Sequence, residues 1–285
     1  MKRWKWAVVV LLGLCGSGVL GGYLYMQGLG DARTEYAKAH GASPEAQRKG
    51  RDLLARATDR MGGRERWKEL REQPIRVSFR HDWDHPLLRM FFMPIEFSGQ
   101  QLSLTLRPGS LDVRLQFLDG NWKGTAWGIR EGETYRVDAA DAVTWEPDDT
   151  IAFQLLGYRY FFFLTFLLSE AELITDAGER ELHGETYDLV YATWGQWEPH
   201  EAADQYLIWI NRETSMVDFV QSTVREMVPR SIVSLALSGY REALGVRLPF
   251  RLRVLEDMDR PETSMHQMTI DSIGQAAPDA FGPPR

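Results

Sequence analysis

The first thirty residues constrain this chain most, because a short basic region leads into a long apolar run. Cations at positions 2, 3 and 5 precede an uncharged, mostly apolar stretch from Ala7 to Met26. At about 1.5 Å of rise per residue, such a stretch crosses the roughly 30 Å hydrocarbon core of a bilayer. We therefore interpret residues 1–30 as a signal anchor that forms an N-terminal transmembrane helix.

Two other interpretations of this segment stay open. Cleavage after Gly30 would place Gly28 and Gly30 at the positions that signal peptidase reads, and Cys15 is compatible with a lipoprotein signal although Leu14 before it is large. The run is longer than the usual secretory core of about 7–15 residues, which favours the uncleaved anchor. The preceding cations place the amino terminus in the cytoplasm. We expect a single-pass inner-membrane protein whose bulk faces the periplasm, or a secreted periplasmic protein if cleavage occurs.

The composition argues against two classes of function. The net charge of the chain is −7 at pH 7, and the part that follows the basic region is more acidic still. An acidic domain is repelled by phosphate backbones, so nucleic-acid binding is disfavoured. The single cysteine, Cys15, lies in the apolar run. The outer domain therefore has neither a disulfide nor a thiol nucleophile.

The body of the chain is dominated by segments with a two-residue period. Ile75, Val77, Phe79, His81 and Trp83 alternate with polar residues, which is the pattern of a half-buried strand. Comparable segments are 102–106, 111–117, 122–127, 134–137, 143–145, 187–194, 205–211, 217–226, 231–238, 248–256 and 267–273. Because no strong helix separates most of them, we expect an α+β fold with one large, strongly curved antiparallel sheet.

Helical signals precede this sheet. Residues 31–72 are predicted as a helical lead-in, in which Ser43 and Pro44 suit the N-cap and first positions of a helix. The sheet domain then occupies residues 73–275, and residues 276–285 form a loose tail.

One apolar segment interrupts the strands, from Ile151 to Leu168. Arg159 lies within it, and an arginine in the middle of a membrane costs about 2.5–3.5 kcal/mol on insertion scales. A helix that is apolar on nearly every side must be covered by other parts of the protein. We interpret it as a core helix held by the curved sheet, with a lid over a lipid-sized cavity or a membrane-dipping element as alternatives. One face of it, at helical spacing, carries Phe153, Leu156, Tyr160, Phe163 and Leu167.

Several strings, taken in order, resemble the LolA/LolB-like superfamily of periplasmic lipoprotein and lipid carriers, in particular its uncharacterised branches. The strings are MGGRERWKELR (61–71), DQYLIWINRET (204–214), STVRE (222–226) and GVRLPFRLRV (245–254). The resemblance implies a half-open antiparallel β-barrel, with helices covering the concave face and an apolar cavity between them. No catalytic motif comes with this family, and the expected membrane anchor distinguishes this chain from soluble carriers.

A concave apolar face would bind an acyl chain without catalytic residues, because each buried CH₂ gains about 0.8 kcal/mol. The same alternation of apolar residues also arises in a closed, filled core. The candidate ligand-binding residues on the sheet are Val77, Phe79, Trp83, Leu104, Val113, Leu115, Phe117 and Ile208, which face the helix residues given above.

Two polar groups are weaker candidates. His81 and His85 share a strand face but lie about 13 Å apart at 3.3 Å per residue, so no metal site is predicted there. His200 and Asp204 would suit a hydrolase, although a solvated acidic loop explains them equally. No motif calls for a cofactor. The leading hypothesis is a non-catalytic, membrane-tethered domain that binds a lipid or lipoprotein acyl chain; an envelope protein-interaction module is the alternative, and a hydrolase the weaker one.

Overall fold

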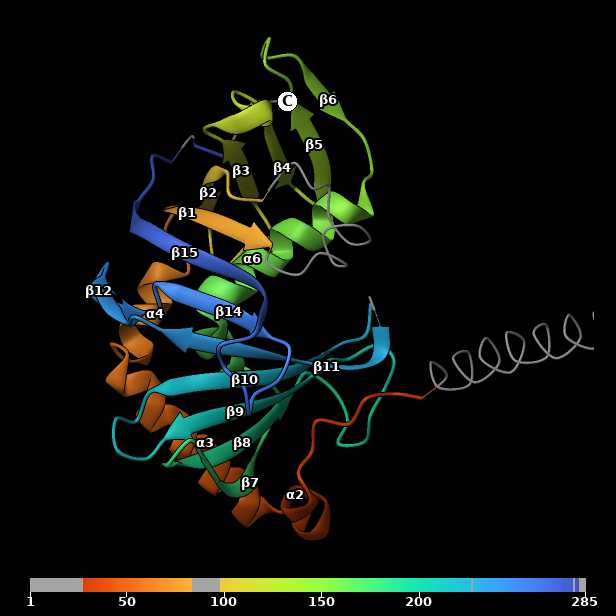
Figure 1. Cartoon of the computed structure of the whole chain (residues 1–285), viewed down its shortest axis with the longest axis vertical. Helices are drawn as coiled ribbons and strands as arrows, with labels where there is room; N and C mark the ends of the chain where they lie inside the picture. The colour runs from red at the N-terminus through yellow and green to blue at the C-terminus, as the bar shows by residue number, and fades with distance from the viewer. Residues whose placement is uncertain (1–27, 84–97, 227, 279, 282–285) are drawn as a thin grey trace, which may run out of the picture.

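In the described part of the chain, thirteen antiparallel strands form one open sheet (Figure 1). This computed structural model describes residues 28–83, 98–226, 228–278 and 280–281. The predicted transmembrane run therefore lies outside the described residues, as does His85. The strand order begins with β6 at one edge and ends with β7 at the other, so the sheet does not close into a barrel.

The order of the strands follows two meanders that meet in the middle of the sheet. The first meander comprises β1 (Ile75–Trp83), β2 (Gln101–Leu106), β3 (Val113–Phe117), β4 (Ala126–Arg130), β5 (Glu133–Val137) and β6 (Val143–Trp145). The second comprises β7 (Leu173–Leu182), β8 (Glu185–Thr193), β9 (Gln205–Asn211), β10 (Val217–Val224) and β11 (Val228–Ser238). The join is made by β14 (Arg251–Leu255) and β15 (Ser264–Gln275), while β12 (Arg241–Ala243) and β13 (Val246–Leu248) form a separate ribbon.

Helix α6 (Asp149–Leu168) connects the two edges of the sheet and lies between its two halves (Figure 1). The carboxylate of Asp148 accepts a hydrogen bond from the backbone N–H of Ile151 and caps the helix. Arg159 donates to the carbonyl of Pro108 at 2.6 and 2.9 Å, so its charged head is satisfied at the protein surface. Among the described residues, α6 is the one helix long and apolar enough to cross a membrane. Its packing against both halves of the sheet identifies it as the predicted core helix.

The end of α6 is fixed by a kink and by aromatic packing. Phe163 leaves helical geometry, with φ −123° and ψ 17°. Trp67, from α4 (Arg64–Leu70), stacks on Phe166 with ring centroids 5.0 Å apart. The indole N–H of Trp67 donates to Glu170 at 2.7 Å, so this tryptophan anchors α4 to the end of α6.

Two further helices pack at the β7–β9 side. Helix α3 (Pro44–Arg60) is capped by Ser43, as predicted, and lies on the same sheet face as α6. Helix α2 (Glu35–His40) packs in a second, smaller cluster with Tyr191 and Trp209. Val190 lies in the main core and Tyr191 in this second cluster, and neighbouring strand residues point to opposite faces. The helices therefore cover both faces here, whereas the sequence predicted helices on the concave face alone.

Three local expectations were wrong. Residues 28–34 are not helical. The first helix of the lead-in, α2, therefore begins at Glu35 and not at Asp31. Residues 120–122 form a 3₁₀ turn, and β4 starts only at Ala126. The edge strand β7 has no counterpart among the predicted strands, because its residues lack the two-residue alternation.

Candidate functional site

The interior of the sheet is filled by side chains. Phe79 contacts both Tyr158 and Phe162 of α6 in edge-to-face geometry, with ring centroids 4.9 and 5.0 Å apart. The packing gap around the kink of α6 has no room for a water molecule. The predicted ligand-binding residues that lie buried in this core are Val77, Phe79, Leu104, Val113, Leu115, Phe117, Phe163, Leu167 and Ile208. Within the described residues, this part of the predicted site is packed core.

The remaining predicted helix residues lie on a different face of α6. Phe153, Leu156, Gly157 and Tyr160 are half-buried and follow one another at helical spacing. We call these four residues the α6 strip. Among the described residues, a Cβ atom added at Gly157 would meet no side chain or other element within 4 Å, so these residues leave open space at the centre of the strip. It is a half-buried apolar surface that packs against the edge of the core.

An aromatic cluster borders the α6 strip at Tyr160. The ring of Tyr160 lies parallel to that of Tyr206, with centroids 6.4 Å apart. Trp194 meets both rings edge-on, at 6.2 and 5.7 Å. Trp194 is the first residue of the β8–β9 loop, and Tyr206 is the second residue of β9. This border therefore lies at one end of the sheet.

A polar cluster borders the strip on its other side, next to Phe161. His81 of β1 contacts the hydroxyl of Tyr158 through Nδ1 at 2.8 Å and Nδ1 of His266 through Nε2 at 2.9 Å. The ring of His266 stacks on Trp83, with centroids 4.3 Å apart, and meets Phe161 at 6.4 Å. The indole Nε1 of Trp83 is buried and has no acceptor among the described residues.

In this cluster the choice of donor in one hydrogen bond fixes the donor in the next. If Tyr158 donates to His81, then His81 donates from Nε2 to His266, and the remaining nitrogen of His266 carries a proton. In that tautomer Nε2 of His266 and the buried Nε1 of Trp83 are both N–H donors. Such a pair suits an oxygen acceptor, for example an ester or carboxylate at the end of an acyl chain.

Burial keeps both histidines neutral. Desolvation lowers the pKa of His81 well below its usual range, and the neighbouring His266 lowers it further. Desolvation also lowers the pKa of His266 to about 3. The sequence placed His81 on the correct face, but it gave no sign of His266, which lies 185 residues away.

His200 and Asp204 do not form an acid–base pair. The Oδ1 atom of Asp204 accepts hydrogen bonds from the hydroxyl of Thr223 and the backbone N–H of Arg225, both at 2.9 Å. The exposed His200 contacts the backbone N–H of Ala202 at 3.1 Å. Asp204 is thus engaged in holding the β8–β9 loop to the next hairpin. Within the described part of the chain, no three His, Cys, Asp or Glu side chains are grouped to hold a metal ion.

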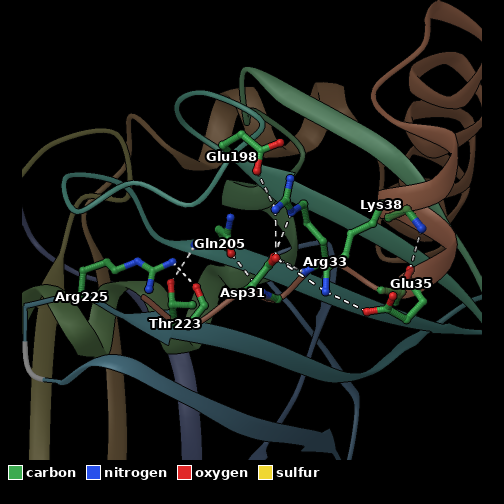
Figure 2. Close-up of polar contacts among 12 residues, drawn as sticks. Asp31, Arg33, Glu35, Lys38, Glu198, Gln205, Thr223 and Arg225 are labelled. Atoms are coloured by element: carbon green, nitrogen blue, oxygen red, sulfur yellow. Dashed lines mark hydrogen bonds and ion pairs between the residues drawn. The ribbon is translucent and has the colours of Figure 1, made fainter. Parts of the chain in front are cut away.

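A third polar cluster holds the segment that enters the domain (Figure 2). Arg33 pairs with Asp31 at 2.9 Å and with Glu198 of the β8–β9 loop at 2.7 Å. Its guanidinium also lies over the ring of Trp197, 5.1 Å from the centroid. The backbone N–H of Ala32 donates to the Gln205 side chain at 2.9 Å. Nothing in the sequence predicted this cluster, because residues 31–33 lie more than 160 residues before their partners at 197, 198 and 205.

Comparison with known proteins gives resemblance at the level of the fold. No family model matches the sequence. No curated protein matches it. Similar solved structures include an outer membrane lipoprotein-sorting protein domain from Vibrio parahaemolyticus (10% identity, TM-score 0.48, covering 82% of this chain and 97% of that one). A LolA superfamily protein from Nitrosomonas europaea (9%, 0.48, 82% and 97%) and a DUF1329 family protein from Desulfovibrio piger (11%, 0.48, 82% and 94%) are also similar.

Two of these structures carry the descriptions lipoprotein-sorting and LolA superfamily, the same class of protein that the sequence strings resemble. Their TM-scores are below 0.5 and their identities near one residue in ten. These matches therefore indicate similarity of fold alone.

Proposed function

We propose that this protein is a membrane-tethered periplasmic domain that binds an acyl-bearing molecule, without catalysis, along the α6 strip. The observation that carries the proposal is the half-buried apolar face of α6 with open space at Gly157. The core beneath it is filled, so the acyl chain lies on the helix surface and not inside a hollow barrel. Its polar end meets the donors of Trp83 and His266.

The energy available on this surface is sufficient for binding. A chain that buries ten CH₂ groups against Phe153, Leu156 and Tyr160 gains about 8 kcal/mol before the cost of association is subtracted. The polar cluster then distinguishes an acyl acid or ester from a plain hydrocarbon, because only the former supplies an acceptor for the unpaired indole N–H.

Replacement of Gly157 by tryptophan should abolish binding. The full chain, reconstituted in lipid nanodiscs, is irradiated with a photoactivatable palmitic acid, and the labelled peptides are identified by mass spectrometry. We expect label on the peptide that contains residues 153–161. In Gly157→Trp the new indole fills the open space on the strip, so the label on this peptide should be lost.

Gly274→Trp is the matched control. Gly274 on β15 also has no atom within 4 Å of an added Cβ, yet it lies eight residues further along the strand than His266. This variant should be labelled like the parent chain. Equal labelling of the two tryptophan variants would overturn the proposal, and a chain that takes up no probe but retains a protein partner on cross-linking in cells would favour the interaction-module alternative.

A further inference from the structure

The backbone of Gly30 is built into the folded domain. Its N–H donates to the carbonyl of Pro229 at 2.9 Å, and its carbonyl accepts from Nη2 of the buried Arg225 at 2.6 Å. A Cβ atom at position 30 would lie 2.6 Å from the carbonyl oxygen of Arg230, so only glycine fits there. The segment therefore runs tightly beside the start of β11, as the chain path in Figure 1 shows.

The linker between the apolar run and the attached residue Gly30 is short. Only three residues lie between Met26, where the run ends, and Gly30. Four steps of fully extended chain span at most about 14 Å. The contacts of Gly30, Ala32 and Arg33 attach the chain to the domain within a few residues of the run.

We infer that the chain is retained without cleavage after Gly30, and that the sheet end formed by the β8–β9 loop and the β10–β11 turn faces the lipid surface of the anchoring membrane. This inference rests on the proposed membrane tether. A mature chain that began at Asp31 would remove the carbonyl that Arg225 binds and the N–H that Pro229 accepts.

This orientation gives the α6 strip a direct route to lipid. Trp194 and Tyr206, which border the strip, lie at the same sheet end as Gln205, whose side chain holds Ala32. Tryptophan and tyrosine rings suit the interface between membrane and water. An acyl chain therefore enters the strip from the anchoring bilayer, and the ligand class is a membrane lipid or a lipid-modified protein in that bilayer.

Site-specific fluorescence quenching tests the orientation. In a Cys15→Ala background, single cysteines are introduced by Glu226→Cys in the β10–β11 turn and by Glu242→Cys in β12. Both positions are exposed, and the eleven residues of β11 place them at opposite ends of the sheet, about 35 Å apart. Each full-length variant carries the same environment-sensitive dye and is reconstituted in phosphatidylcholine vesicles that contain nitroxide-labelled head groups.

We expect loss of fluorescence at position 226 and none at position 242. Gly30→Ala, which removes the tight attachment, should weaken the quenching at 226. Quenching that is equal at both positions, or stronger at 242, overturns the proposed orientation. If the protein still floats with the vesicles in that case, the membrane tether itself stands. Absence of flotation overturns the tether itself. Intact mass of the membrane-extracted chain gives a second reading, because a mature chain that starts at Asp31 contradicts retention.

Discussion

Acidification from pH 6.5 toward pH 3 is expected to destabilise the folded domain through His266, by about 1.4 kcal/mol per pH unit, and the buried His81 adds to this loss. The folded-state pKa of His266 is lowered to about 3 by burial, and that of His81 is lowered as well. The unfolded chain therefore binds protons below pH 6.5 that the folded chain does not. The stabilisation is complete above pH 6.5 and is lost as the pH falls through this window.

The measurement is the free energy of unfolding of the full chain in detergent at pH 7, 6 and 5. His266→Gln keeps a hydrogen-bonding partner for His81. It should lower the slope of the free energy of unfolding against pH by the contribution of one bound proton. His40→Gln, which replaces an exposed histidine on α2 far along the chain from this pair, is the matched control for the loss of a histidine. Carboxylates held at low pKa, such as Asp148, contribute only nearer pH 4, so they do not obscure this range. An unchanged slope in His266→Gln would contradict the prediction.

Gly50→Ala should be among the most destabilising single substitutions in the chain. The added Cβ would lie 2.4 Å from the carbonyl carbon of Thr175 and 2.6 Å from the backbone nitrogen of Asp176, so α3 would have to move away from β7. Overpacking against backbone costs about 3 kcal/mol. The shift would also disturb the 2.7 Å ion pair between Lys49 and the buried Asp176.

Gly157→Ala is its matched control, because the same substitution in another helix should have the opposite sign. An added methyl group at Gly157 meets open space, and alanine is better than glycine in a helix by about 1 kcal/mol. Thermal unfolding of the two variants beside the parent chain checks both effects. A Gly50→Ala variant that is more stable than the parent chain, or a Gly157→Ala variant that is as unstable as Gly50→Ala, would contradict these predictions.

Local patterns in the sequence predicted the elements whose signals are local. The alternation from Ile75 to Trp83 gave β1 and its buried face correctly, and Ser43 gave the start of α3. Strand β7 was missed because Gly178 and charged residues break its alternation. In this strand Asp176 is buried, and its charge is paired with that of Lys49, which lies on a helix more than a hundred residues earlier in the chain.

The candidate site was predictable only in part for the same reason. Helical spacing placed Phe153, Leu156 and Tyr160 on one face, but it also placed Phe163 there. The kink at Phe163 turns that residue into the core, and no local pattern marks the kink. Whether the sheet was hollow or filled depended on how α6 packs against both halves, which apolar alternation alone does not determine.

The position of β15 makes the order of synthesis matter. This strand is the last element of the chain, yet it lies in the middle of the sheet, between β1 and β14, and Ile75 pairs with Gln275. Until residues 264–275 emerge, each half of the sheet ends in an unpaired central edge that another strand can occupy. A contact of such long range also slows folding. Synthesis from the amino-terminal end would therefore leave the two halves unjoined until β15, the strand that connects them, has been made.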